Sequence, residues 1–259
     1  MDLGIKGRTA IVCASSRGLG RACAQALAEE GVALVINGRS PDSLDTTASE
    51  IRRATGVSVT AVAADVTTEA GRAALLAACA APDILVTNAG GPPAGDFREW
   101  DEAAWRRAVE ANMLAPIMLI KAVIDGMISR RFGRIVNITS RAVRAPLPHL
   151  GLSNGARAGL TGFVAGLARQ VARHNVTINN LLPGPFATGA QDEVLHAMAA
   201  KAGEDYESFA RARMAEVPAG RFGVPTEAGK ACAYLCSADA GFVVGHNLLI
   251  DGGAVNLTM

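Results

Sequence analysis

Short apolar runs alternate with longer amphipathic segments along almost the whole chain. The runs are β-branched and bounded by turn residues, which is typical of buried strands; they are Thr9–Ala14, Ala33–Asn37, Val57–Ala63, Ile84–Thr87, Arg134–Ile138, Thr177–Leu182 and Leu248–Ile250. The segments between them have helical spacing; they are Leu19–Glu30, Pro41–Thr55, Thr68–Ala80, Asp101–Arg130, Leu152–His174 and Thr226–Ser237. This alternation predicts an α/β fold, a doubly wound parallel sheet of about seven strands with helices on both faces.

The 259 residues contain no linker rich in Pro, Gly or Ser and no repeat, so we expect one domain over residues 1–259. One stretch breaks the alternation. Residues 186–222 are charged and weakly helical, and they follow the breaker Pro183-Gly184-Pro185. A segment of this length after a strand is expected to be a lid-like substrate loop or a poorly ordered loop.

Composition excludes several classes of function. The net charge of +1 gives no basic surface for nucleic acid or an anionic membrane. We find no signal peptide, and no apolar run that approaches the ~20 residues of a membrane span. The cysteines are odd in number and lie in apolar segments, and no His or second Cys pair completes a metal site beside Cys232 and Cys236. Buried reduced thiols are therefore expected, which favours a cytoplasmic protein.

A glycine-rich turn follows the first predicted strand, in the sequence "CASSRGLGRACAQALAEEG". Gly18 and Gly20 open a helix there, so backbone amides and the helix N-terminus can meet a pyrophosphate. The spacing is that of G-x-x-x-G-x-G with Ala14 in the first Gly position. The alternative is a tight strand–helix connection that binds no ligand.

Two arginines indicate which dinucleotide such a turn would bind. Arg17 lies inside the turn, and Arg39 follows the second strand, where the adenosine ribose would lie. An NAD site offers a carboxylate to the ribose, whereas an NADP site offers Arg to the 2′-phosphate. Gly38 stands where that acid would be expected, and no Asp or Glu lies between Val32 and Pro41. The sequence therefore favours NADP(H), with two solvated arginines as the alternative.

With these residues in place, the chain resembles the short-chain dehydrogenases/reductases, most closely the 3-oxoacyl-carrier-protein reductase type. The motifs that carry the resemblance span essentially the whole chain; they are "ASSRGLG" at 14–20, "ADV" at 64–66, "TNAGG" at 87–91, "EANMLAP" at 110–116, "RIVNITS" at 134–140, "NNLLPGPFAT" at 179–188, "GRFGVPTE" at 220–227 and "IDGGAVN" at 250–256. The resemblance implies a Rossmann-type sheet of seven parallel strands, a nicotinamide dinucleotide, a small-molecule carbonyl or alcohol substrate, and a homotetramer or homodimer.

The resemblance also implies the cofactor contacts. Asp65 and Val66 are expected to flank the adenine, Asn88, Ala89 and Gly90 to line the cofactor near its ribose, and Pro183, Gly184 and Thr188 to contact the nicotinamide half. The complete expected set is Ser15, Ser16, Arg17, Gly18, Leu19, Gly20, Arg39, Asp65, Val66, Asn88, Ala89, Gly90, Pro183, Gly184 and Thr188.

Four positions match the family's catalytic residues. Asn112 corresponds to the Asn that holds a water in a proton relay, and Ser140 to the Ser that hydrogen-bonds the substrate carbonyl. The alternative for Asn112 is a structural Asn that caps backbone groups at a helix kink, and the alternative for Ser140 is an ordinary hydroxyl at the end of a strand. The family's Y-x-x-x-K begins thirteen residues after that Ser, and here the count gives Ser153 and Arg157. The following "AGLTGF" fits the family without a gap, so the resemblance implies that both residues are replaced.

This replacement is unfavourable to ordinary carbonyl reduction. A Tyr beside a Lys can be tuned from its usual pKa of about 10 toward neutrality, whereas a Ser hydroxyl is a far weaker acid. Arg157 keeps a positive charge for ribose hydroxyls but cannot exchange a proton.

Other side chains could supply the proton. His149 lies on the loop expected to face the substrate and could donate near neutrality, although an ordinary loop His is the simpler interpretation. Tyr206 lies in the lid-like segment, and Tyr234 is expected in the core. Arg141 and Arg144 on the substrate loop would bind an anionic substrate or be solvated.

Three functions fit these observations. The first is an NADP(H)-dependent oxidoreductase that interconverts carbonyl and hydroxyl groups, with Ser140, Asn112 and a water or His149 replacing the missing Tyr. The second is a catalytically silent or weak homologue that binds a nucleotide. The third is a non-redox reaction on the same scaffold, since fold alone does not decide function. The cofactor residues favour the first.

Overall fold

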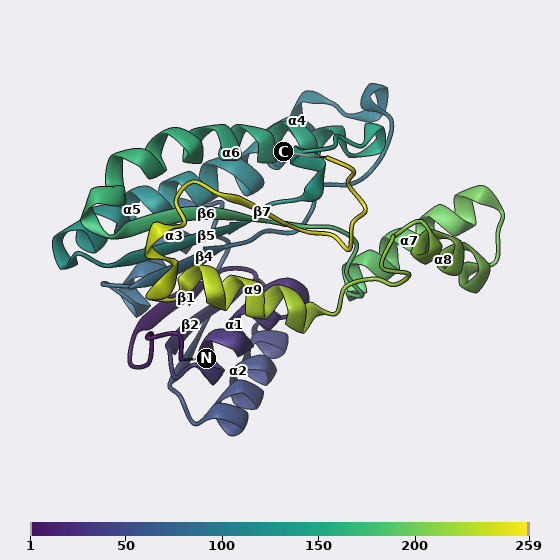
Figure 1. Cartoon of the computed structure of the whole chain (residues 1–259). Coiled ribbons are helices and arrows are strands. Elements are labelled where there is room, and N and C mark those ends of the chain that lie inside the picture. The colour runs from purple at the N-terminus through teal and green to yellow at the C-terminus, as the bar shows by residue number, and fades with distance from the viewer. Residues whose placement is uncertain (1, 258–259) are drawn as a thin grey trace.

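The computed structural model describes residues 2–257 and contains one sheet of seven parallel strands. The strands are β1 (Thr9–Val12), β2 (Ala33–Gly38), β3 (Val59–Ala63), β4 (Ile84–Thr87), β5 (Gly133–Ile138), β6 (Val176–Pro183) and β7 (Asn247–Ile250). They are arranged in the order β3-β2-β1-β4-β5-β6-β7. Figure 1 labels the strands from β2 to β7 along this order. All seven predicted strands are present, and the prediction of fold class is confirmed.

Helices cover both faces of the sheet. One face is packed by α1 (Gly18–Glu29), α2 (Pro41–Thr55) and α9 (Pro225–Cys236), and the other by α3 (Glu69–Ala78), α5 (Ala115–Arg130) and α6 (Gly151–Val171) (Figure 1). Each face has its own cluster of buried apolar side chains. The chain also contains short 3₁₀ segments: η1 (Phe97–Glu99), η3 (Arg141–Val143), η4 (Pro148–Leu150), η5 (Ala172–His174) and η6 (Asp239–Phe242).

A chain of hydrogen-bonded polar side chains crosses four neighbouring strands. The Thr87 hydroxyl donates to Asn137 Oδ1 (2.7 Å), and Asn137 Nδ2 donates to Asn180 Oδ1 (3.0 Å). Asn180 Nδ2 then donates to Asn247 Oδ1 (2.8 Å). A one-residue slip of any strand would move its polar side chain to the other face of the sheet. This ladder therefore helps to fix the register of β4 through β7, whose carboxyl ends carry the candidate site.

One helical rod runs from Glu102 to Arg130 and joins α4 (Glu102–Val109), the π turn η2 (Glu110–Leu114) and α5. By length and composition alone it could cross a membrane, which the search for apolar runs did not anticipate. Leu119, Ile120 and Val123 are buried in the core cluster against the sheet. Packing within the chain therefore accounts for much of its apolar character.

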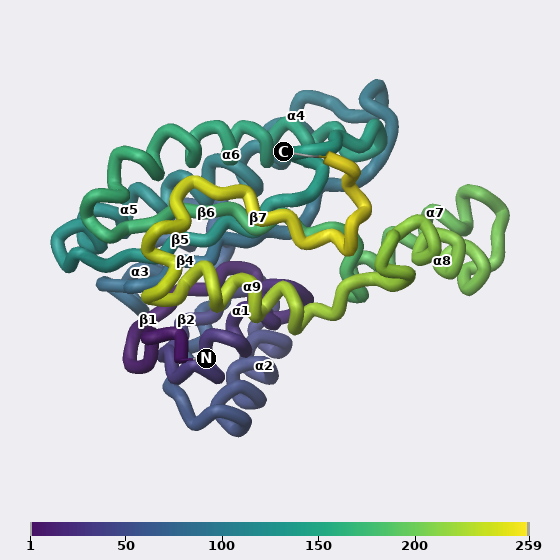
Figure 2. Tube along the Cα trace, in the orientation of Figure 1, coloured from purple at the N-terminus to yellow at the C-terminus, as the bar shows by residue number. Residues whose placement is uncertain are grey.

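Residues 186–222 are largely helical. They contain α7 (Gly189–Ala202) and α8 (Tyr206–Ala215), a helical hairpin that projects from the body of the molecule in Figures 1 and 2. The hairpin has a small apolar cluster of its own, with Leu195 and Phe209 as its largest buried members. The segment is therefore a pair of helices rather than an unstructured loop.

Two further predictions concern single side chains. All five cysteines are free thiols and four of them are buried, as expected. The prediction that Tyr234 lies in the core is wrong, because its side chain is exposed. It projects from the side of α9 opposite Cys232, Leu235 and Cys236, which face the sheet.

Candidate functional site

All strands run parallel, so their carboxyl ends meet at one edge of the sheet, and the glycine-rich turn connects β1 to α1 there. A Cβ on Gly20 would lie 2.2 Å from the Ala14 carbonyl oxygen, so only glycine allows this close approach. Gly18 has φ +59°. Ala14 itself adopts φ +45°, so an alanine occupies the left-handed region where the family pattern has glycine. The turn therefore keeps the tight geometry that a phosphate site needs.

The two serines of the turn differ in what they can offer a ligand. Ser15 is fully buried; its hydroxyl donates to Val12 O (2.7 Å) and accepts from the Asn37 N–H (3.0 Å). That hydroxyl is committed to joining β1 and β2. Ser16 is partly exposed and packs over Gly38, where a Cβ would lie 3.2 Å from the Ser16 hydroxyl oxygen. Leu19 packs against the core, so its side chain serves the fold.

The carboxyl ends of β2 and β3 bring Arg39 and Asp65 close together. Hydrogen bonds from the Thr67 N–H and hydroxyl lower the pKa of Asp65, and the charge of Arg39 acts in the same direction. Arg39 is exposed and makes no ion pair with any residue between 2 and 257. Val66, which follows, is partly buried against the core. A guanidinium is therefore available where an adenosine ribose would lie.

The end of β4 lies beside the turn. Asn88 Nδ2 donates to the Ala14 carbonyl oxygen (3.3 Å), and Ala89 is half-buried next to it. A Cβ built on Gly90 would meet nothing within 4 Å, so open space lies above this strand end. Open space here, with Arg39 at one side and the N-terminus of α1 below, fits an elongated anionic dinucleotide.

The end of β6 forms the opposite wall. Pro183 is buried as the last residue of the strand, and Gly184 packs so closely on Asp251 that a Cβ would lie 2.6 Å from the Asp251 Cβ. The Thr188 hydroxyl accepts from the Gln191 N–H (3.2 Å) and caps α7. These three residues thus lead from the sheet edge into the projecting hairpin.

Ser140 and Asn112 approach the site from different elements. Ser140 follows β5, is partly exposed, and caps η3 by accepting from the Ala142 N–H (3.1 Å). Asn112 is buried inside the π turn, a feature that often marks functional sites. Its Nδ2 donates to Ala108 O (3.3 Å), while its Oδ1 has no hydrogen-bond partner in the described part of the chain.

Ser153 and Arg157 lie one turn apart on the buried face of α6. Arg157 Nη1 donates to the carbonyl oxygens of Ile138 (2.7 Å) and Thr139 (3.0 Å), at the end of β5 just before Ser140. Burial lowers the pKa of Arg157 to about 10. Its Nε and Nη2 atoms and the Ser153 hydroxyl make no hydrogen bond to residues 2–257. One guanidinium nitrogen therefore holds the strand end, and the other two are uncommitted.

The structure adds contacts that the sequence analysis missed. A Cβ on Gly151 would lie 2.6 Å from the Trp100 ring, and one on Gly155 would lie 3.2 Å from the Trp105 ring. The Gly95 N–H donates to the His149 carbonyl oxygen (3.0 Å). The loop after β4 is thereby fastened to the start of α6. The available signal for this packing was a pair of glycines four residues apart, one just before the predicted helix and one within it.

Tyr206 and His149 occupy different surroundings. Tyr206 lies on the hairpin, where its hydroxyl donates to Asp192 and its ring stacks on His196 at 3.7 Å. The hydrogen bond to Asp192 raises the pKa of Tyr206, which makes the phenol a weaker acid. His149 is exposed on η4, immediately before α6. His149 thus precedes the helix that carries Ser153 and Arg157, whereas the Tyr206 hydroxyl is bonded to Asp192 on the hairpin.

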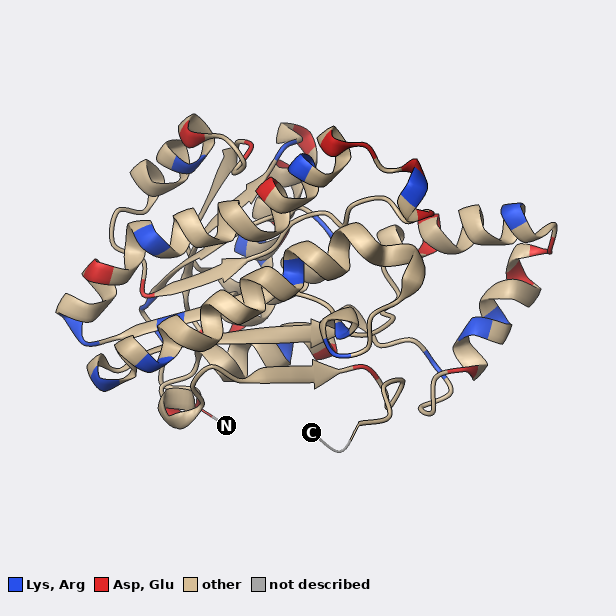
Figure 3. Ribbon diagram, turned by 90° about the horizontal axis from the view of Figure 1, so that it is seen from above, with Lys and Arg blue, Asp and Glu red and all other residues tan. Residues whose placement is uncertain are grey.

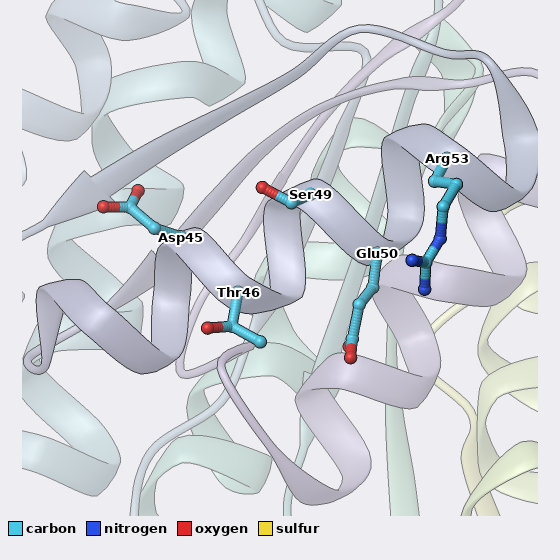
Figure 4. Close-up of a pocket in the computed structure, with 5 residues that line it drawn as sticks. All are labelled: Asp45, Thr46, Ser49, Glu50 and Arg53. Carbon is cyan, nitrogen blue, oxygen red and sulfur yellow. The ribbon is translucent and has the colours of Figure 1, made fainter.

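Two surface pockets lie away from this edge. One, of about 570 Å³, is lined by residues along the exposed side of α2 (Figure 4); these are Asp45, Thr46, Ser49, Glu50 and Arg53. The other, of about 250 Å³, lies on α4 and η2 beside Trp105 and Leu114. Neither is lined by a residue of the candidate site.

Known proteins resemble this chain over nearly its full length. A family model described as enoyl-(acyl carrier protein) reductase matches residues 13–255. The 3-oxoacyl-[acyl-carrier-protein] reductase FabG of Vibrio cholerae is 34% identical over 97% of this chain and 98% of its own length.

Solved structures agree. L-sorbose reductase from Gluconobacter frateurii, complexed with NADPH and L-sorbose, superposes with a TM-score of 0.93 at 30% identity, covering 99% of this chain and 100% of that one. A single-residue variant of actinorhodin polyketide ketoreductase with NADPH gives 0.90 at 30% identity, covering 96% and 98%. The resemblance in the motifs is thus confirmed, and the chain belongs to the short-chain dehydrogenase/reductase family.

Proposed function

We propose that the chain is an NADP(H)-dependent oxidoreductase that interconverts carbonyl and hydroxyl groups on a small molecule, in the manner of 3-oxoacyl reductases. The observation that carries the proposal is that three features lie along one edge of the sheet: the glycine-rich turn, Arg39 and the open space above Gly90. Two related proteins of the same fold, L-sorbose reductase and a polyketide ketoreductase, hold NADPH. The absence of an acid at Gly38 favours the phosphorylated dinucleotide.

The cofactor residues divide by position. Arg17 and Arg39 would hold the 2′-phosphate, and Asp65 and Val66 would flank the adenine. The turn from Ser16 to Gly20 would supply backbone amides to the pyrophosphate, with Ser15 supporting it from beneath. Asn88, Ala89 and Gly90 would line the cofactor near its ribose, and Pro183, Gly184 and Thr188 would contact the nicotinamide half. The bound cofactor supplies or accepts the hydride.

We further propose that Ser153 and Arg157 stand in place of the Tyr and Lys of typical relatives. Ser140 and Ser153 would each donate a hydrogen bond to the substrate carbonyl oxygen. Arg157 holds the strand end beneath Ser140 through Nη1, and its uncommitted Nε and Nη2 would bind ribose hydroxyls. The proton would come from a water held by Asn112 or from His149, because neither Ser nor Arg is an effective proton donor.

A second candidate function is a nucleotide-binding homologue with little or no turnover. The specific observation in its favour is that Arg157 is buried and that two backbone carbonyls hold its Nη1, so it cannot move and exchange protons with a neighbouring acid as a Lys does. A non-redox reaction on the scaffold is the third candidate.

Two measurements separate these candidates. One is a titration of the protein with NADPH and with NADH, and the other is NADPH consumption with a panel of ketones and acyl thioesters. Binding with turnover supports the oxidoreductase. Binding without turnover on any substrate supports the silent homologue, and failure to bind either dinucleotide supports a non-redox reaction.

Several further expectations belong to this proposal. The chain would act as one domain, with the α7–α8 hairpin as a lid over the substrate. Exposed Leu114, Met118 and Phe163 on the rod and α6 would pack against a second copy, in a homotetramer or homodimer. Free buried thiols fit a reducing, cytoplasmic compartment.

A further inference from the structure

An ion pair joins the glycine-rich turn to the projecting hairpin. Arg17 Nη1 lies 3.5 Å from Glu193 Oε1. Arg17 occupies the N-cap position of α1, and Glu193 lies near the start of α7. The two residues belong to opposite walls of the candidate site.

Few other contacts tie the hairpin to the body near this point. Its apolar cluster is separate from the two clusters that pack the sheet. A bridge between Phe186 and Gly223 closes its base, and Thr188 lies against Gly18, where a Cβ would be 3.9 Å from the Thr188 methyl carbon. Figure 3 shows the hairpin extending from the body with charges of both signs along it. Arg17–Glu193 is therefore a charged contact at the junction of hairpin and turn.

The two predicted phosphate-binding arginines differ in their partners. Arg39 makes no ion pair within residues 2–257, whereas Arg17 already has a carboxylate. The Arg17 and Glu193 side chains are 75% and 69% exposed, so the pair can exchange partners with a ligand from solvent. A carboxylate on a phosphate-binding arginine competes with the phosphate for that arginine.

We propose that Glu193 is a specificity-determining residue: its carboxylate competes with the 2′-phosphate of NADP(H) for Arg17. This proposal rests on the proposed function and deepens it. Glu193 weakens the binding of the phosphorylated dinucleotide and leaves that of NAD(H), which has a ribose hydroxyl at this position, nearly unchanged. Glu193 thus reduces the preference for NADP(H) over NAD(H) that Arg17 and Arg39 create.

The test is the variant Glu193→Gln, which keeps the size of the side chain and removes its charge. Exposed ion pairs change an equilibrium constant only modestly. We expect the Kd for NADPH to fall by about two- to five-fold at low salt, and the Kd for NADH to change by less than about 1.5-fold. The gain should shrink at high salt, because exposed charges are screened. Glu207→Gln is the matched control, since Glu207 is an exposed carboxylate on α8 without an ion pair among the described residues.

A double-mutant cycle with Arg17→Met separates competition for Arg17 from a general charge effect. We expect the gain from Glu193→Gln to disappear in the Arg17→Met background. An equal gain in both backgrounds, an equal gain from Glu207→Gln, or no gain in the parent would overturn the role of Glu193 while leaving NADPH binding intact. Failure of the parent protein itself to bind NADPH would instead remove the proposed function, and this inference with it.

Discussion

Replacing Arg157 by Met tests whether the guanidinium is a structural part of the site. Met fills a similar volume, but it cannot donate to the carbonyl oxygens of Ile138 and Thr139. A hydrogen bond from a charged donor contributes about 1.5–3 kcal/mol, so the two together contribute about 3–6 kcal/mol. Burial opposes this, because it lowers the pKa of Arg157 from 12.5 to about 10, a cost of about 3 kcal/mol at about 1.4 kcal/mol per pKa unit.

The difference predicts that Arg157→Met lowers the free energy of unfolding by up to about 3 kcal/mol. For a chain of 259 residues this corresponds to a fall in Tm of up to about 9 °C. Thermal unfolding followed by circular dichroism at fixed protein concentration measures it. Arg169→Met is the matched control, because Arg169 is an exposed residue of the same helix that donates within that helix, and its loss should shift Tm by less than about 2 °C. A higher Tm for Arg157→Met than for the parent would refute the view that this residue fastens α6 to the end of β5.

Three other predictions concern cofactor, assembly and pH. Arg39→Asp should reverse the preference from NADP(H) to NAD(H) in binding titrations, since a carboxylate repels the 2′-phosphate and accepts from a ribose hydroxyl; equal affinity of the parent for both would contradict this. Light scattering should give a homotetramer or homodimer that Phe163→Asp dissociates, because Phe163 is an exposed aromatic residue on an apolar face; a monomeric parent at micromolar concentration would refute it. Hydrogen bonds from Arg221 lower the pKa of exposed Glu227 from 4.5 to about 2, so the stability from this pair is present above pH 4.5 and lost as pH falls toward 2. The Tm of Glu227→Gln should therefore lie below that of the parent above pH 4.5, and this difference in Tm should shrink as the pH falls from 4.5 toward 2. A difference in Tm that stays constant over this interval would contradict the prediction.

The fold could be predicted from the sequence because a buried parallel sheet leaves a strong signal. The five inner strands are covered on both faces and read as short apolar runs, and the edge strands β3 and β7 are apolar although partly exposed. All seven were therefore located within about two residues of their ends. The hairpin gave a weaker signal. Its helices pack mainly on each other through a few residues, including Leu195 and Phe209, and most of their surface is solvated.

The site was predictable only in outline. Sequence spacing placed Ser153 and Arg157 on one face of a helix, as the structure has them. It did not reveal that Arg157 donates to backbone carbonyls of β5, because every residue carries a carbonyl and acceptors of this kind have no sequence signature. For the same reason the burial of the Ser15 hydroxyl between two strands was not foreseen. The ion pair from Arg17 to Glu193 was not foreseen because it depends on where the hairpin lies in space.

The most direct test of the central claim is the double variant Ser153→Tyr with Arg157→Lys, assayed for NADPH affinity and for turnover of a 3-oxoacyl substrate. The variant returns a tunable phenol and its ammonium neighbour to the buried face of α6, and general acid catalysis typically contributes ~10²–10⁴-fold. We predict a gain in turnover of at least about tenfold, or about 1.4 kcal/mol of transition-state stabilisation, with neither single variant doing as well. A double variant that folds and binds NADPH like the parent yet reduces the substrate no faster would contradict the account, because the site would then be built around Ser153 and Arg157 for a different reaction.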